Sequence, residues 1–354
     1  MGSVGEAAPS AKAIIPIIDF SRWMQPTTAE DRLAVAKDLI AACQSVGFVY
    51  ITNHGLSQDL LDEAFAMSQR LFDLPLSEKM KAPHPDGPEV HRGYSFPGLE
   101  KVSQYSGGDE AEGERLRAVV DVKESYEVGS EDNKLQPNVW LPESSLTDFK
   151  RCTTSFYWAC NSAAQEVLRC IATGLGLPDE EFFVKHCSGH NNQLRLLHYP
   201  PVPASDIESG KASRISSHSD WGIITLLFQD DCGGLEVEHP LKPGEYIRAT
   251  PLKNACVMNV GDLLMRWTND MLESTLHRVT LPPLADRYSV TDNEQRMTRA
   301  RYSIPYFVSA DPEAVIECLP ECSSPARPAK YVPVTQAEYG RMRAKVQYRS
   351  KPAT

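Results

Sequence analysis

Residues 216–234 read SSHSDWGIITLLFQDDCGG, a polar start followed by a run of apolar and β-branched residues. Such a run, bounded by turn-forming residues, predicts a buried strand. His218 and Asp220 stand one residue apart just before it. Side chains at positions i and i+2 of a strand point to the same face, so we expect the imidazole and the carboxylate to converge. The pair is either an ordinary polar loop end or two ligands of one metal ion.

A third ligand is available in the later segment STLHRV, which also has the composition of a strand and contains His277. Two neutral imidazoles and one carboxylate are the donor set of non-haem Fe(II) oxygenases, and this set leaves metal positions open for substrate and oxygen. Taken alone, His277 fits a hydrogen-bonded core or surface histidine equally well. The metal interpretation therefore depends on a further element of the sequence.

That element is the segment ARYSIPYF, where Arg301 and Ser303 repeat the i, i+2 spacing. An arginine can grip a carboxylate with two parallel hydrogen bonds, and a serine hydroxyl can add a third. The alternative is a surface ion pair, but a buried arginine in so apolar a strand needs an anionic partner. The pair thus predicts a binding site for a dicarboxylate cosubstrate. Arg299 competes for this role, although it lacks the serine partner.

The first half of the chain has helical patterns. Thr27 and Glu30 are spaced as a capping box before a periodic segment that ends at Gly47, and Ser57 is a candidate cap for a second helix. Apolar residues at spacings of three and four predict a long helix over about 149–171. Strands are expected at 14–20 and in GFVYITNHG, and long loops with short strands between about 82 and 138.

From Gln193 onward, short strand-like runs follow one another, separated by Gly, Pro, Asn and Asp. They are LRLLHYP, IITLLFQ, GLEVEH, ACVMNV, STLHRVTL and ARYSIPYFV. This pattern is typical of an antiparallel sandwich or barrel. With helices first and strands later, we predict an α+β fold in which N-terminal helices buttress a β core.

Composition limits the partners and the compartment. The 354 residues carry a formal net charge of −11, which disfavours nucleic acid as the main partner. The nine cysteines form no CxxC pair, as expected of free thiols in a reducing compartment. No secretory leader or membrane-spanning apolar stretch is visible. We therefore expect a cytoplasmic protein that acts on a small molecule and does not bind a membrane. We expect it to be a monomer or a homodimer.

Together, the arrangement of His218, Asp220, His277, Arg301 and Ser303 resembles the 2-oxoglutarate- and Fe(II)-dependent oxygenases of the isopenicillin N synthase-like family. Further segments resemble that family in the same order over most of the chain from Ile14 to about Phe307. Among them are IPIIDFS, GFVYITNHG, RGYSFPGLEK, DVKESYEVG, GGLEV and VNVGDLLMRWTND.

The resemblance implies a distorted double-stranded β-helix, or jelly-roll, with iron at its open end. It implies that His218, Asp220 and His277 ligate Fe(II), that Arg301 and Ser303 bind the distal carboxylate of 2-oxoglutarate, and that Tyr199 contacts its other end. O2 would be the second cosubstrate, and ascorbate would support activity. The implied division is a disordered tail (1–13), an N-terminal helical and loop part of the same domain (14–180), the jelly-roll core (190–310) and a C-terminal helix or tail (311–354).

Among relatives, the segments RLLHYP, RGYS and RYSIPYF look closest to fungal enzymes of the thymine 7-hydroxylase type. That likeness implies a substrate held by Arg195 and placed between the rings of Trp221 and Phe307, with Trp221 in place of a tyrosine. The competing interpretation of both aromatic residues is ordinary core packing.

We therefore predict a 2-oxoglutarate-dependent dioxygenase that oxidises a C–H bond of a small, planar or ring-containing molecule in fungal secondary metabolism. Succinate and CO2 would be the co-products. Alternatives are a thymine or pyrimidine methyl hydroxylase of nucleobase salvage and an amino-acid hydroxylase. A divalent-metal hydrolase would not need the Arg301–Ser303 pair, and a non-catalytic binder of the same fold would not need to keep all five residues.

Overall fold

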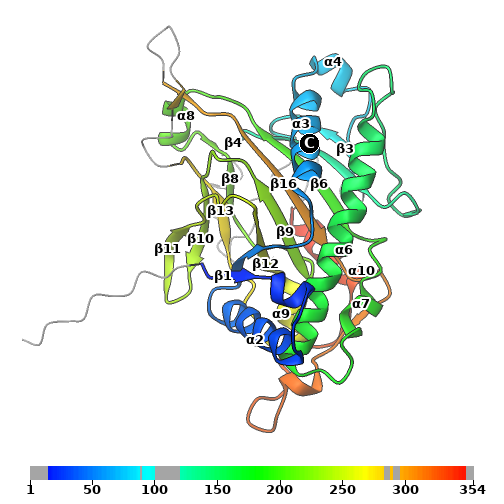
Figure 1. The fold of residues 1–354 in the computed structure, drawn as a ribbon. Coiled ribbons are helices and arrows are strands. Elements are labelled where there is room, and N and C mark those ends of the chain that lie inside the picture. The colour runs from blue at the N-terminus through cyan, green and yellow to red at the C-terminus, as the bar shows by residue number, and fades with distance from the viewer. Residues whose placement is uncertain (1–14, 88–89, 100–119, 283–287, 290–295, 348–354) are drawn as a thin grey trace, which may run out of the picture.

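A computed structural model describes residues 15–87, 90–99, 120–282, 288–289 and 296–347, and Figure 1 shows its ribbon. The elements of the first half are β1 (Ile17–Asp19), α1 (Ser21–Met24), α2 (Ala29–Ser45), β2 (Phe48–Thr52), α3 (Gln58–Phe72), α4 (Leu76–Lys79), β3 (Gly93–Ser95), β4 (Val120–Asp121), β5 (Glu124–Gly129), α6 (Phe149–Leu175) and α7 (Phe182–His186). The elements of the second half are β6 (Gln193–Tyr199), α8 (Ala204–Glu208), β7 (Ala212–Ser213), β8 (Ile215–His218), β9 (Ile224–Gln229), β10 (Leu235–His239), β11 (Lys242–Arg248), β12 (Ala255–Val260), α9 (Asp262–Trp267), β13 (His277–Val279), β14 (Tyr288–Ser289), β15 (Met297–Thr298), β16 (Arg301–Val308), β17 (Val315–Ile316), a 3-10 turn (Pro320–Cys322), β18 (Val334–Thr335) and α10 (Gln336–Gln347).

Two sheets form the centre of the molecule. The larger has eight strands in the order β1-β2-β12-β9-β16-β6-β5-β3, and the smaller has four in the order β11-β10-β13-β8. The larger sheet thus combines strands from both halves of the chain, and all its pairings except β1–β2 are antiparallel. This arrangement of two mostly antiparallel sheets is the predicted jelly-roll architecture.

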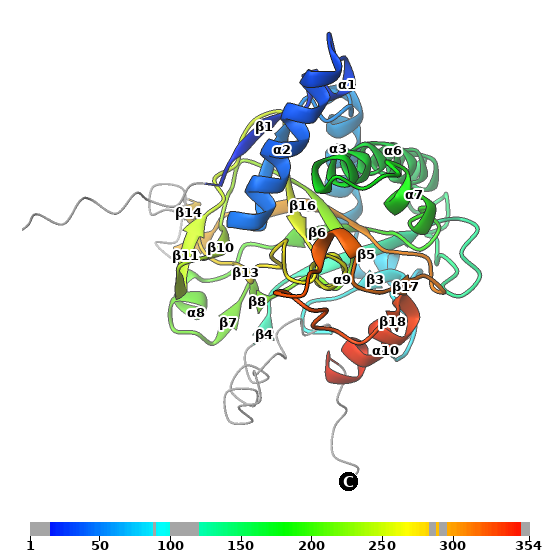
Figure 2. The same ribbon diagram turned by 90° about the horizontal axis from the view of Figure 1, so that it is seen from below.

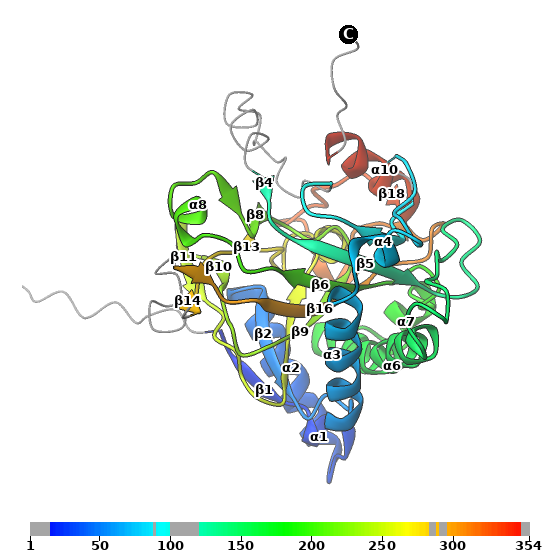
Figure 3. The same ribbon diagram turned by 90° about the horizontal axis from the view of Figure 1, so that it is seen from above.

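The helices lie mainly on one side of the sheets. In Figures 2 and 3, α2, α3 and α6 occupy one side of the molecule, whereas β8, α8 and α10 lie toward the opposite side. Successive side chains of a strand point to opposite faces of the sheet, and both faces of the larger sheet carry apolar residues. Its outer face packs against the helices in a large core cluster that includes Leu226, Ile304 and Tyr306. The predicted α+β class, with helices buttressing a β core, is therefore confirmed.

The inner face of the larger sheet meets the smaller sheet in a second apolar cluster. Phe48, Leu197 and Tyr199 come from the larger sheet, and Leu235 and Val237 come from the smaller. Polar side chains interrupt this cluster where the candidate site lies. The residues between the sheets therefore both hold the fold together and surround the site.

The first long helix begins one residue later than predicted. Its N-cap is Thr28, whose hydroxyl accepts a hydrogen bond from the backbone N–H of Asp31, while the Asp31 carboxylate accepts one from the N–H of Thr28. The expected box of Thr27 and Glu30 was therefore wrong by one position, because an aspartate at N3 serves as well as a glutamate. The predicted cap of α3, Ser57, and the predicted end of α2 at Gly47 are confirmed.

Several described elements were not predicted, among them the short helices α1, α4, α7 and α8, the strand β11 and the helix α9. The sequence of β11 lacks the alternation of apolar and polar residues that indicates a strand, because most of its residues are exposed. The short helix α9 follows β12 directly, so its sequence reads as a continuation of the strand. The predicted tail at 1–13 lies outside the described residues. Over the residues that the structure covers, none of the helices is both long and apolar enough to cross a bilayer.

Gly47 provides a test of how α2 is joined to the segment before His277. Its φ is +71°, and a Cβ there would clash with the backbone carbonyl oxygen of Glu273. Gly176 has a similar φ of +74°, but a Cβ there would have no atom within 4 Å, so it serves as a matched control. We expect Gly176→Ala to cost about 1–2 kcal/mol in the free energy of unfolding, from the left-handed backbone alone. Gly47→Ala should cost more because it adds the clash. Chemical denaturation of both variants measures the difference, and equal losses would contradict the close packing at Gly47.

Candidate metal and cosubstrate site

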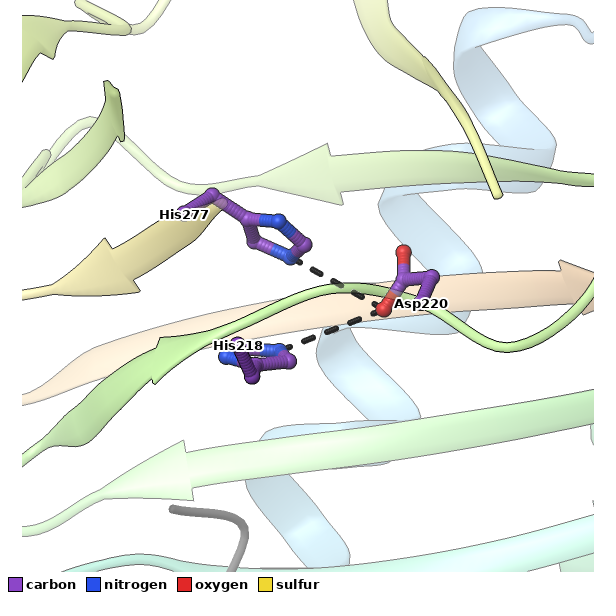
Figure 4. Close-up of side chains that lie close together, drawn as sticks. All are labelled: His218, Asp220 and His277. Atoms are coloured by element: carbon purple, nitrogen blue, oxygen red, sulfur yellow. Dashed lines mark ion pairs between the residues drawn. The ribbon is translucent and has the colours of Figure 1, made fainter. Parts of the chain in front are cut away.

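Three side chains converge between the two sheets, as Figure 4 shows. His218 ends β8 and His277 begins β13, and the two residues are direct partners in the antiparallel register. Asp220 Oδ1 lies 3.9 Å from Nε2 of His218 and 3.8 Å from Nε2 of His277. One potential ligand atom from each residue lies within 4.8 Å of the others. Two strands and one loop therefore present the predicted donor set at one point.

Asp220 reaches this point by a different route from the one predicted. The strand β8 ends at His218, so the shared face of a strand does not direct the carboxylate. Instead, the backbone carbonyl of Asp220 accepts a hydrogen bond from the N–H of Asp262 (2.8 Å). Its Oδ2 accepts one from Thr225 Oγ1 (2.6 Å) and one from Asn259 Nδ2 (2.8 Å). With Oδ2 so occupied, Oδ1 is left facing the two imidazoles.

Both imidazoles are oriented by backbone carbonyls. Nδ1 of His218 lies 2.9 Å from the carbonyl oxygen of Ser216, and Nδ1 of His277 lies 3.2 Å from that of Thr275. A carbonyl can only accept, so in the neutral rings the proton is assigned to Nδ1 and the lone pair to Nε2. Each Nε2 thus faces Asp220 in the form that binds a metal.

The charges of the site also suit a cation. Burial, together with the neighbouring His277, lowers the pKa of His218 to about 4, so this ring is neutral at physiological pH. Burial opposes ionisation of Asp220, but the two imidazoles and the hydrogen bonds from Thr225 and Asn259 outweigh it and lower its pKa. Two neutral nitrogens and one carboxylate fit Fe(II) with coordination positions left open.

The predicted carboxylate anchor lies on β16, on the inner face of the larger sheet. Arg301 and Ser303 are each 1 % exposed, and Arg301 Nη1 donates to Ser303 Oγ at 3.0 Å. Arg301 Nη2 donates to Gln229 Oε1 at 3.0 Å, whereas its buried Nε has no hydrogen-bond partner within the described parts of the chain. A buried guanidinium whose hydrogen-bond partners are neutral and whose Nε–H has no acceptor is suited to bind an anion.

Tyr199 lies beside this anchor. It is the register partner of Arg301 across β6 and β16, and the Arg301 guanidinium carbon is 5.0 Å from the centre of its ring. A second buried arginine, Arg214, lies 5.8 Å from the same ring. Two buried cations at this end of the sheet favour a dianionic ligand.

The competing arginine has a different setting. Arg299 pairs with Asp231 at 2.8 Å, and its side chain is 34 % exposed. It already has an anionic partner at the surface, whereas Arg301 is buried and has no carboxylate within 4 Å among the described residues.

The structure brings together only two of the three predicted substrate residues. The guanidinium carbon of Arg195 is 5.7 Å from the centre of the Phe307 ring, on the inner face of the larger sheet. Trp221 instead lies 5.6 Å from the guanidinium carbon of Arg343 on α10, and it packs partly against the larger core cluster. Core packing therefore accounts for part of the role of Trp221.

Several residues around the site were not predicted from the sequence. Thr225 lies within residues 216–234, but an isolated threonine in an apolar strand gives no signal. Asn259 and Gln229 become relevant only through strand pairing. Glu127 lies opposite Arg195, and Arg343 belongs to the C-terminal helix. The missing information in each case was which distant strands and helices are neighbours.

Removing the support of Asp220 should weaken metal binding without unfolding the protein. We expect Thr225→Val to lower affinity for Mn(II), a redox-silent substitute for Fe(II), by roughly 10–100-fold, because the outer hydrogen bonds orient the ligand. Thr225→Ser keeps the hydroxyl and is the matched control. Isothermal titration calorimetry measures both variants. Equal affinity of Thr225→Val and the unaltered protein would contradict this role of Thr225.

Comparison with known proteins agrees with this geometry. Residues 190–310 match the family model of the 2OG-Fe(II) oxygenase superfamily, and residues 15–143 match that of the N-terminal region of non-haem dioxygenases in morphine synthesis. The chain is 40 % identical to the 2-oxoglutarate-dependent dioxygenase frbA of Dothideomycetidae sp., covering 86 % of this chain and 88 % of the relative. It is 41 % identical to the proline hydroxylase buaE of Petromyces alliaceus, covering 84 % and 88 %.

Among solved structures, the chain is similar to the full-length thymine 7-hydroxylase of Neurospora crassa in complex with α-KG and thymine. The TM-score is 0.83 at 37 % identity, covering 96 % of this chain and 99 % of the other. A putative 2OG-Fe(II) oxygenase family protein of Caulobacter crescentus follows with a TM-score of 0.74 at 29 % identity, covering 94 % and 98 %.

Proposed function

The chain belongs to the 2-oxoglutarate and Fe(II) oxygenase superfamily, and on that premise we propose that it oxidises a C–H bond of a small, planar or ring-containing molecule. The protein is a dioxygenase that uses Fe(II), 2-oxoglutarate and O2 and that forms succinate and CO2 as co-products. Bound Fe(II) supplies the oxygen chemistry, which side chains alone do not provide. The protein contributes binding, orientation and the exclusion of competing reactions.

We assign the metal ligands to Nε2 of His218, Nε2 of His277 and Oδ1 of Asp220. The observation that carries this assignment is the convergence of these three atoms. The other nitrogen of each histidine ring lies beside a backbone carbonyl, and the other oxygen of Asp220 accepts a hydrogen bond from a side chain. These three side chains would hold Fe(II), and this donor set would leave coordination positions open for 2-oxoglutarate and O2.

We assign the distal carboxylate of 2-oxoglutarate to Arg301 and Ser303, with Tyr199 beside them. The buried guanidinium and its Nε, which lacks a partner among the described residues, support this role. Gln229 orients the guanidinium through its amide oxygen. The tyrosine ring and the second arginine, Arg214, would close the apolar and cationic end of this binding site.

For the substrate, Arg195 would supply hydrogen-bond donors and Phe307 a flat apolar surface. Arg343 lies beside the Trp221 ring, and its Nη2 is 3.4 Å from Oγ of Ser219, the residue between two proposed ligands in the sequence. Arg343 would therefore link the C-terminal helix to the edge of the same site. The relatives leave two substrate classes open. One is a pyrimidine, from the structure with thymine, and the other is an amino acid, from the proline hydroxylase.

We further propose that the enzyme acts in fungal secondary metabolism, in the cytoplasm and as a monomer. The fungal dioxygenase relatives support the first point. The nine unpaired cysteines, eight of them buried, and the net charge of −11 support a reducing compartment without a nucleic-acid partner. Light scattering on the purified protein tests the monomer, and a stable dimer would contradict it.

The central experiment measures succinate formed from 2-oxoglutarate with Fe(II), ascorbate and a substrate panel of pyrimidines and amino acids. We expect His218→Ala to lose at least roughly 100-fold in turnover, because two ligands hold the metal less firmly than three. His239→Ala, at the end of β10 and outside the site, should retain the activity of the unaltered protein. Full activity of His218→Ala would remove the ligand assignment.

A conservative pair of variants tests the anchor. Arg301→Lys keeps the charge but loses the planar fork, so we expect KM for 2-oxoglutarate to rise roughly 10–100-fold, the equivalent of about 1.5–3 kcal/mol for a hydrogen bond to a charged group. Arg299→Lys should leave KM within about two-fold, because that arginine lies in an exposed pair. The reverse ranking of the two variants would move the anchor to Arg299.

A further inference from the structure

Asp262, the first residue of α9, is a buried carboxylate that belongs neither to the proposed metal ligands nor to the cosubstrate anchor. Its backbone N–H donates a hydrogen bond to the carbonyl oxygen of Asp220 at 2.8 Å. Its Oδ1 accepts one from the hydroxyl of Ser274 at 2.7 Å, in the segment that leads to His277. Asp262 therefore contacts both the loop of one proposed ligand and the segment before another.

The other partners of the Asp262 carboxylate come from the C-terminal helix α10. Oδ2 accepts a hydrogen bond from the hydroxyl of Tyr339 at 2.8 Å and pairs with Nη1 of Arg343 at 3.1 Å. Both residues lie on one face of α10, together with Gln336, at positions i, i+3 and i+7. If α10 moved away, Ser274 alone would remain among the described partners of this carboxylate. A buried carboxylate that loses its donors is destabilised, so the docked helix helps to hold Asp262 in place.

Arg343 also reaches the loop of Asp220 directly. Its Nη2 donates to Oγ of Ser219 at 3.4 Å, and its guanidinium carbon lies 5.6 Å from the centre of the Trp221 ring. Ser219 and Trp221 are the residues on either side of Asp220 in the sequence. One guanidinium thus joins these two neighbours to Asp262, which holds the carbonyl of the same ligand. A displacement of Arg343 therefore acts on the backbone that carries Asp220.

The docking of α10 depends mainly on polar contacts. Within residues 336–343, Tyr339 is the one buried hydrophobic side chain. The start of the helix is fixed, because the N–H of Gln336 donates to the carbonyl of Ala314 at 3.0 Å. A segment with few buried apolar contacts opens at a small cost in free energy. Its docking equilibrium can therefore be shifted by any event that favours the docked state.

Resting on the proposed function, we propose that Asp262 and Arg343 are positioning residues that couple the docking of α10 to the occupancy of the metal site. The docked helix holds the loop of Asp220 through these two side chains. Coupling between two binding equilibria is reciprocal, so occupancy of the metal site favours the docked helix by the same factor. The C-terminal helix thus supports the metal site, although none of the proposed ligands lies on it.

The sign of the effect on metal affinity separates this role from two simpler ones. By charge alone, the guanidinium of Arg343 repels a nearby cation, so its removal should tighten metal binding. As a positioning group it holds Asp220 in the ligand geometry, so its removal should weaken metal binding. A role in the stability of the fold alone would lower the free energy of unfolding and leave the affinity of the folded protein unchanged.

The first test measures Mn(II) affinity of the full-length protein by isothermal titration calorimetry. We expect Arg343→Gln to lower this affinity roughly 5-fold or more, the lower end of the usual range for coupled sites. Arg341→Gln, which removes an exposed arginine of the same helix, is the matched control and should stay within about two-fold of the unaltered protein. Circular dichroism verifies that each variant is folded. An affinity of Arg343→Gln equal to that of the unaltered protein, or higher, would overturn the proposal.

Hydrogen exchange followed by mass spectrometry tests the reverse direction. Saturating Mn(II) should slow the exchange of backbone amides in residues 336–343 of the unaltered protein roughly 5-fold or more. The same addition to Arg343→Gln should give little or none of this protection. Exchange in 336–343 that Mn(II) leaves unchanged in the unaltered protein would overturn the coupling. This measurement needs no variant, so it decides the proposal even if Arg343→Gln does not fold.

A double-mutant cycle tests whether the two residues act through one another. If Asp262 and Arg343 form one connection, the variant that combines Asp262→Asn with Arg343→Gln should bind Mn(II) within about two-fold of the weaker single variant. Losses that multiply in the double variant would overturn the joint role of the pair. If Asp262→Asn does not fold, calorimetry on Arg343→Gln and hydrogen exchange still decide the proposal.

Failure of the underlying function has a separate signature. If Mn(II) does not bind the unaltered protein, or binds His218→Ala equally well, the ligand assignment falls and the coupling falls with it. If Mn(II) binds the unaltered protein, is lost from His218→Ala and binds Arg343→Gln without change, the ligand assignment stands. That last result confines the failure to the role of α10.

Discussion

The hydrogen bonds that Thr225 and Asn259 donate to one oxygen of Asp220 are the constraint on which the site depends. They hold in place a loop carboxylate that no strand directs, so that the other oxygen of this candidate ligand faces two imidazoles. They also join the loop after β8 to two central strands of the larger sheet, β9 and β12. A displacement of these strands would thus move a ligand. The stability of the sheet and the geometry of the site are therefore coupled.

The inner face of the larger sheet divides the chemistry by position. One end of β16 has the buried guanidinium of Arg301, suited to a dicarboxylate. Near the other end of β16, Phe307 pairs with Thr225, which supports the candidate ligand Asp220. Because alternate residues of each strand face outward into the helical core, mutations can affect either packing or recognition without necessarily affecting both. This separation explains how one sheet can carry a stable core and a polar site.

Motifs that are local in sequence could be predicted, and long-range neighbours could not. The i, i+2 spacings of His218–Asp220 and Arg301–Ser303 identify candidate ligands because side-chain chemistry and spacing are both visible in a few residues. The geometric reason expected for the first pair was nevertheless wrong, since the strand ends at His218. Asn259 has no local signal, because its role depends on the register of β12 with β9.

The proposed ligation of iron by Nε2 of His218, Nε2 of His277 and Oδ1 of Asp220 underlies every role proposed for the surrounding residues. Anomalous X-ray scattering at the iron absorption edge tests it most directly, on crystals grown without oxygen in the presence of Fe(II) and 2-oxoglutarate. We expect one strong peak, about 2.0–2.2 Å from each of these three atoms, the usual range for such ligands. A peak bound to other side chains, or one ligated through Nδ1 of either histidine, would contradict it.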